Sequence, residues 1–101
     1  MARLIYSVQA FTDLERLIDF LVESYPAAAL KTVQLIEEAV TLLRNHPLLG
    51  RPVEEGMQEL IISRGQTGYV ALYSFEAAHD AVLILAVRHQ REVGYAHGDD
   101  Q

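Results

Sequence analysis

The apolar residues of this chain change their spacing about half-way along, and that change limits the folds available to it. Before residue 46 most apolar side chains recur every three or four positions, which places them on one side of a helix. From residue 58 onward they alternate with polar ones or form short continuous runs, as in strands. Helices segregated from a run of strands, rather than alternating with them, indicate an α+β domain.

The helical half contains two predicted segments. The first follows a short strand-like stretch at 4–8 and begins either at Thr12, whose spacing to Glu15 is that of a capping box, or earlier at Ser7. It ends before Pro26, which fits the first turn of the second helix. That second helix is the clearest element and ends at the Asn-His-Pro sequence of 45–47. Its apolar stripe steps by four and three through Ala29, Val33, Ile36, Val40 and Leu43.

Three further strands are predicted at 58–63, 69–75 and 81–87. The last is a continuous apolar run, as expected for a central strand covered on both faces. The predicted fold is therefore a strand–helix–helix–three-strand meander, with a helical hairpin packed on an antiparallel sheet. We expect one domain over 1–101, with a partly disordered tail at 92–101. The predicted core consists of Leu14, Ile18, Leu21, Val33, Ile36, Val40, Leu60, Leu72, Leu83 and Leu85.

Composition excludes several classes of protein. The chain has no cysteine, so it forms neither a disulfide framework nor a thiolate metal site. No stretch has the apolar length of a membrane span, and the first residues lack the pattern of a signal peptide, so we expect a cytoplasmic protein without a membrane partner. The net charge of −6, with Lys31 as the single lysine, disfavours direct binding to nucleic acid.

A series of short motifs carries a family resemblance over almost the whole chain, from about residue 4 to residue 95. It includes Asp13-Leu14 with Ile18 and Phe20 in the first helix, and the sequences YPAAA at 25–29, HPLLGRP at 46–52, ELIIS at 59–63, YVALY at 69–73, VLILAV at 82–87 and HQR at 89–91. Each motif is common, but their order and spacing resemble the RelE/ParE superfamily of toxins from type II toxin–antitoxin systems. The likeness is nearer to ParE, the plasmid-stabilisation type. Two departures are Gln58 and Val70, where many members have arginine.

The resemblance implies one of two activities and a partner. ParE-like members resemble poisons of DNA gyrase, and RelE-like members resemble ribosome-dependent messenger-RNA endonucleases; both are neutralised by an antitoxin encoded beside them. We expect a gyrase inhibitor without catalytic residues, cofactor or metal, bound in a hetero-oligomer by a ParD-like antitoxin. The alternatives are the endonuclease and a non-toxic interaction module that keeps the fold.

The basic side chains of the second half are the candidates for target binding. They are Arg64, Arg88, His89 and Arg91, and with Tyr95 they are also the candidates for RNA cleavage, which needs a base, an acid and cations at the phosphate. The competing interpretation makes these arginines solvated strand ends and salt-bridge partners, and His89 a hydrogen-bonding residue at a strand end. The four histidines have no metal-ligand spacing.

Other conspicuous residues have structural interpretations. A carboxylate in the first turn of a helix is explained by the helix dipole, and we interpret Asp13 in this way. Arg51 is expected to fix its loop by pairing with Glu54 or Glu59. Tyr69 and Tyr73 share one strand face and are expected at the core and its rim.

The second helix is apolar over a wider arc than one contact face requires, which indicates a receiving surface for the antitoxin. A disordered antitoxin segment can add a helix, a strand or both to the helical hairpin and the adjacent sheet edge. The residues assigned to this surface are Leu17, Phe20, Ala28, Leu35 and Leu42.

Overall fold

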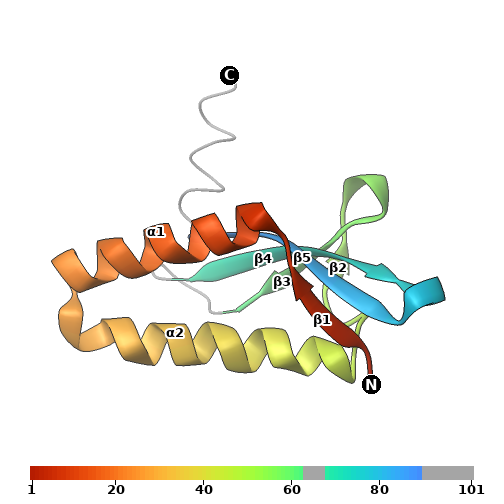
Figure 1. The fold of residues 1–101 in the computed structure, drawn as a ribbon, viewed down its shortest axis with the longest axis horizontal. Coiled ribbons are helices and arrows are strands. Elements are labelled where there is room, and N and C mark those ends of the chain that lie inside the picture. The colour runs from red at the N-terminus through yellow and green to blue at the C-terminus, as the bar shows by residue number, and fades with distance from the viewer. Residues whose placement is uncertain (63–67, 90–101) are drawn as a thin grey trace.

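Figure 1 shows the computed structural model, which describes residues 1–62 and 68–89. Two long helices lie beside a five-stranded sheet whose order is β1-β5-β4-β3-β2. The elements are β1 (Arg3–Tyr6), α1 (Val8–Ser24), α2 (Pro26–Thr41), β2 (Arg51–Pro52), β3 (Gln58–Ile61), β4 (Tyr69–Glu76) and β5 (Ala81–His89), with single 3₁₀ turns η1 (Leu42–Arg44), η2 (Glu54–Gly56) and η3 (Ala77–His79). The predicted α+β class and the order of the helices and main strands are confirmed.

The strands β3, β4 and β5 pair antiparallel, as a meander requires. The sheet is nevertheless mixed, because β1 pairs parallel to β5 from Arg3 opposite Ala81 to Tyr6 opposite Ile84. The prediction of a purely antiparallel sheet is therefore wrong at β1. The short strand β2 also lies within the segment 47–56, which the sequence predicted as a loop.

The first helix begins at the earlier of its two predicted starts. Ser7 is the N-cap: its Oγ accepts a hydrogen bond from the Ala10 N–H at 3.0 Å and donates one to the Leu85 carbonyl at 3.1 Å. Thr12 consequently lies inside α1 and not at its start. Pro26 occupies the first turn of α2, as predicted. No helix in the part of the chain that the structure describes is long and apolar enough to cross a membrane.

The main core lies between the helices and one face of the sheet. Alternate residues of β4 face it, and Tyr73 is completely buried. From β5 it receives Val82, Ile84 and Val87. The odd spacing of these three residues reflects a bulge: Tyr73 pairs with Ile84 while Leu72 pairs with Ala86, so Leu85 is an extra residue in β5.

Six of the ten predicted core residues are only half-buried. Leu21, Ile36, Val40 and Leu60 are buried, as predicted. Leu83 lies on the opposite sheet face from Val82 and Ile84, and both described helices lie on the side of Val82 and Ile84. On the face away from the helices Ala81 and Ala86 are nevertheless buried and Leu83 is half-buried, as expected for a central strand. The predicted core residues that are half-buried instead are Leu14, Ile18, Val33, Leu72, Leu83 and Leu85.

Candidate partner-binding surfaces

Asp13 is a fully buried carboxylate beside the part of β5 that follows Ile84, where β1 has ended and no strand of the described residues covers the edge. Its Oδ2 accepts a hydrogen bond from the Val87 N–H at 3.0 Å, and its Oδ1 accepts one from Gln9 Nε2 at 2.8 Å. The first-turn interpretation of Asp13 is wrong, because α1 begins at Val8 and the carboxylate points to β5. Asp13 instead links α1 to β5 through its hydrogen bond with the Val87 N–H.

Arg88, a predicted target-binding residue, faces the same carboxylate. Its Nε lies 3.7 Å from Asp13 Oδ2, which is within ion-pair range but too long for a hydrogen bond. This Nε is buried without a hydrogen-bond partner, whereas the side chain as a whole is 43% exposed. Arg16 adds a second cation 3.5 Å from Asp13 Oδ1. Arg88 is thus both a salt-bridge partner, as the competing interpretation held, and accessible at the end of β5.

His89 ends β5 with its ring against Tyr69. The ring centroids are 5.3 Å apart and the planes are nearly perpendicular, at 86°. The two residues also pair across β4 and β5. The other predicted target-binding residues, Arg64 and Arg91, lie outside the described residues, as does Tyr95. The structure therefore shows neighbouring positions for Arg88 and His89 only.

The sheet face turned away from the helices, here called the open face, is largely apolar at its centre. Its residues include Ile61, Val70, Leu72 and Leu83, by the alternation of each strand from its core-facing neighbours. Val70, one of the two positions where arginine was expected from the family, is 6% exposed. It lies between Ile61 and Arg88 in the sheet.

At the other side of the open face, Arg51 pairs with Glu59. This confirms one of the two predicted pairings, with Glu59 rather than Glu54 as the partner. Both Nε and an Nη of Arg51 donate to Glu59 Oε1, at 2.9 and 2.7 Å. The arginine is 68% exposed and the glutamate 17%. Because the arginine is exposed, the pair stabilises the fold weakly but fixes the direction of both side chains.

Gly50 is held tightly beside this pair. Its N–H donates to the Tyr73 hydroxyl at 2.8 Å, and its carbonyl accepts from Gln58 Nε2 at 3.2 Å. A Cβ at Gly50 would lie 2.7 Å from the Glu59 carbonyl oxygen, so no larger residue fits without a shift. Gln58, the second position where arginine was expected, is therefore a buried residue that fixes the 45–50 loop. Burial raises the pKa of Tyr73, although the bond from Gly50 partly opposes this.

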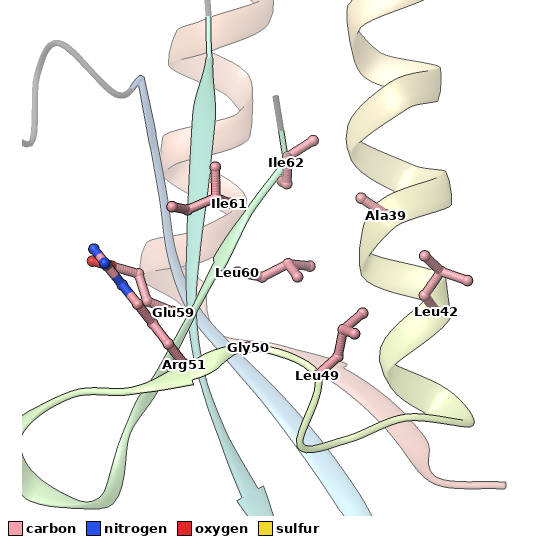
Figure 2. Close-up of a pocket in the computed structure, with 9 residues that line it drawn as sticks. All are labelled: Ala39, Leu42, Leu49, Gly50, Arg51, Glu59, Leu60, Ile61 and Ile62. Atoms are coloured by element: carbon pink, nitrogen blue, oxygen red, sulfur yellow. The ribbon is translucent and has the colours of Figure 1, made fainter. Parts of the chain in front are cut away.

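A groove runs between α2 and the outer edge of β3, and Figure 2 shows its lining. Its volume is about 430 Å³. Leu60 and Ile62 point from β3 and its end toward α2, while Glu59 and Ile61 point to the open face. We call it the β3 groove. Its apolar lining consists of Ala39, Leu42, Leu49, Leu60, Ile61 and Ile62, and Gly50, Arg51 and Glu59 complete it.

The residues assigned to antitoxin binding occupy three different environments. Leu17 is 5% exposed and belongs to the core, so its assignment to an exposed surface is wrong. Phe20 and Ala28 are exposed near the turn of the helical hairpin, where Phe20 contacts Tyr25. Leu35 is exposed on α2, and Leu42 is exposed at the start of η1, where it lines the β3 groove. The sequence did not single out Leu49, although a leucine pair in a proline- and glycine-rich loop is a usable signal of an exposed apolar patch.

The described residues contain no group of three or more histidine, aspartate or glutamate side chains able to hold a metal ion. The polar groups around Asp13 make hydrogen bonds and ion pairs within the protein. Residues 1–62 and 68–89 contain two features: the contact between Arg88 and the buried Asp13 at the end of β5, and the apolar groove at β3. Both are features suited to protein binding.

Solved structures of the same fold come from toxin–antitoxin systems. The chromosomal ParDE system of P. aeruginosa superposes with a TM-score of 0.74 at 29% identity, covering 88% of this chain and 96% of that one. The RelBE2 toxin–antitoxin complex of Mycobacterium tuberculosis gives 0.58 at 25% identity, covering 88% and 98%. The molecule is thus a small α+β domain of the ParE/RelE fold.

Sequence comparison gives the family. Residues 4–94 match the family described as the ParE toxin of the type II toxin–antitoxin system, parDE. The chain belongs to this family. Toxin RelE3 of Caulobacter vibrioides is 37% identical over 84 residues, which are 83% of this chain and 89% of that protein. Toxin RelE1 of the same organism is 42% identical over 67 residues, 66% and 72% respectively.

Proposed function

We propose that this chain inhibits DNA gyrase in the cytoplasm and is neutralised by a cognate ParD-like antitoxin. The proposal rests on one observation: the arginines described beside the open face are directed at carboxylates of the protein itself. Arg51 is engaged by Glu59, and Arg88 faces the buried carboxylate of Asp13. Metal-free phosphoryl transfer needs positive charge directed at the scissile phosphate, whereas these guanidinium groups are directed at carboxylates.

The apolar centre of the open face supports the same conclusion. Val70 and Ile61 occupy it next to Arg88, where a nuclease surface would be expected to carry cations. Ile61, Leu72 and Leu83 are half-buried on this face, so they keep some exposed apolar surface with an arginine at its margin. Such a surface is suited to a protein partner, since the centres of protein interfaces are apolar and enriched in arginine. The similarity to the ParDE system favours a ParD-like antitoxin as the neutralising partner.

A ribosome-dependent messenger-RNA endonuclease is the second candidate, because both Caulobacter relatives bear the name RelE. It would use Arg88 and His89 together with Arg64, Arg91 and Tyr95. The ring of His89 is packed edge-on against Tyr69, which restricts its use as a general base. The third candidate is an interaction module without toxicity, whose remaining function would be to bind the antitoxin.

The deciding experiment gives the purified protein two targets in parallel. With gyrase and relaxed plasmid we expect loss of supercoiling and accumulation of double-strand breaks. With translating ribosomes we expect intact message. Codon-specific cleavage with normal supercoiling would establish the endonuclease instead, and inactivity in both assays together with normal antitoxin binding would establish the non-toxic module.

A further inference from the structure

We propose that the buried carboxylate of Asp13 positions Arg88 for target binding. It draws the guanidinium group of Arg88 to the edge of β5, where the outer N–H groups of that guanidinium meet a carboxylate of the target protein. The inference rests on the proposed function in one respect, the existence of a protein target that the end of β5 contacts. It adds a positioning residue that does not itself touch the target, and the chemical class of the group that Arg88 binds.

The carboxylate of Asp13 is the fixed member of the contact. It is completely buried, and its two oxygens accept hydrogen bonds from two different elements. The Val87 N–H of β5 donates to Oδ2 at 3.0 Å, and Gln9 Nε2 of α1 donates to Oδ1 at 2.8 Å. A carboxylate held by the helix and the strand together keeps its place, so the arginine is the member whose direction is set.

The course of the Arg88 side chain shows the effect of this carboxylate. Because Val87 faces the core, Arg88 leaves β5 on the open face, in one row with Val70 and Ile61. Its Nε nevertheless lies 3.7 Å from Asp13 Oδ2, the oxygen that binds the Val87 N–H at the edge of the strand. The side chain therefore runs around the edge of β5 and not across Val70.

The contact between Arg88 and Asp13 is poorly suited to stabilising the fold. In the pair of Arg51 and Glu59 two guanidinium nitrogens donate hydrogen bonds, at 2.9 and 2.7 Å. The Nε of Arg88 is buried and has no hydrogen-bond partner, which is unfavourable for stability. What remains is the attraction between opposite charges, which gives the guanidinium a direction. A local arrangement that costs stability is typical of a functional site.

The same geometry leaves part of Arg88 accessible to a partner. The arginine approaches Asp13 through Nε, whereas the side chain as a whole is 43% exposed. The two Nη atoms carry four more N–H groups, in a planar fork that matches a carboxylate or a phosphate. The net charge of −6 and the apolar row formed by Val70 and Ile61 disfavour a nucleic-acid surface. The fitting ligand is therefore a carboxylate of a protein.

A double-mutant cycle tests whether Asp13 acts through Arg88. Asp13→Asn keeps an oxygen for the Val87 N–H, and the amide of Gln9 can rotate to suit it, but the charge that attracts Arg88 is lost. We expect Arg88→Ala to weaken inhibition of gyrase supercoiling about tenfold and Asp13→Asn about fivefold. The double variant should be no weaker than Arg88→Ala, because the positioned side chain is already missing. Full additivity of the two losses, with all variants folded, would overturn positioning.

Matched variants separate positioning from a structural role. Ser7→Ala weakens another link between α1 and β5, and Asp19→Asn removes an exposed charge from the same helix, so both should inhibit like the wild type. Arg88→Lys keeps the charge but not the fork and should be nearly as weak as Arg88→Ala. This variant leaves Asp13 intact, so its result does not depend on whether Asp13→Asn folds. Full activity of Arg88→Lys would overturn the inference.

Arg16 is the other arginine near this carboxylate, with an Nη 3.5 Å from Asp13 Oδ1. If Arg16→Ala, and not Arg88→Ala, made Asp13→Asn silent, Arg16 would be the positioned residue and the inference would be wrong. Binding of plain DNA or RNA by the wild type, lost in Arg88→Ala, would make the ligand a phosphate and overturn the protein carboxylate.

Growth arrest in bacterial cells, measured for the same variants, does not depend on which target is inhibited. If the wild type arrests growth without inhibiting gyrase, the proposed function fails. The cycle in the growth assay then still decides whether Asp13 acts through Arg88. If the wild type does neither, Arg88 has no target and the positioning role is lost with it.

Discussion

At the scale of single residues, the buried carboxylate of Asp13 joins the helix to the sheet. It is the acceptor for the Val87 N–H, which would otherwise be buried at a strand edge without a partner. Asp13→Ala should lower the free energy of unfolding by about 1–3 kcal/mol, because that N–H loses its acceptor. Urea denaturation measures the change. Asp19→Ala, at an exposed position of the same helix, should change it by less than about 0.5 kcal/mol.

The role of Asp13 could not be predicted from the sequence, because its two main partners lie in different elements. Gln9 is one turn earlier in α1, but Val87 is 74 residues away and becomes a neighbour only when β5 packs beside α1. Arg51 was predictable, since its acid lies close in the chain. Arg64 and Arg91, half of the proposed target-binding set, lie outside the described residues, so that part of the prediction is untested.

At the scale of elements, α1 provides a direct test of the two starts that the sequence allowed. Ser7→Ala removes the N-cap and should lower the free energy of unfolding by about 1 kcal/mol. Thr12→Ala is a substitution at an exposed position inside the helix, where alanine has the higher helix propensity, so stability should stay constant or rise slightly. Thermal melts of both variants would contradict this assignment if Thr12→Ala were the more damaging change.

The order of elements was predictable from periodicity, but the register of β5 was not. A continuous apolar run does not reveal which residues face the helices, and the bulge at Leu85 shifts the alternation within it. The parallel pairing of β1 is also a long-range contact that no local pattern encodes. β4, which alternates clearly, lies where it was predicted, and Tyr69 and Tyr73 are buried. The assignment of Leu72 to the core was wrong, because Leu72 points to the open face.

The register of β5 leads to a second test at this scale. Ile84 is completely buried, so Ile84→Ala should cost about 2–5 kcal/mol of stability. Leu83 is half-buried on the open face, and Leu83→Ala should cost about half as much, because less apolar surface is returned to water. Chemical denaturation compares the two directly. A larger loss for Leu83→Ala would mean that the open face is the main core.

At the scale of the whole molecule, buried tyrosines make stability depend on pH on the alkaline side. Burial raises the pKa of Tyr6, Tyr69 and Tyr73 above the ordinary 10.0. Their stabilisation is complete below pH 10 and is lost as the pH rises toward the folded-state pKa, because the unfolded chain releases protons that the folded chain retains. Urea midpoints should therefore fall above about pH 10. Tyr73→Phe, although less stable at neutral pH, should show a shallower fall.

The residues expected to bind the target and Leu42, assigned to antitoxin binding, lie in different parts of the fold, and this separation leads to a final prediction for the whole molecule. β4 lies between β5, which carries Arg88, and β3, which borders the β3 groove. Replacing Arg88 and Arg91 together with alanine should weaken toxicity roughly tenfold or more, by loss of charged contacts to the target, while antitoxin affinity stays constant. Leu42→Asp should do the reverse and leave the toxin active but poorly neutralised. Growth assays with and without the antitoxin measure both effects. Since Arg88 also faces Asp13, a thermal melt must first show that the double variant is folded. If a folded double variant lost antitoxin binding and toxicity together, the two surfaces would be one.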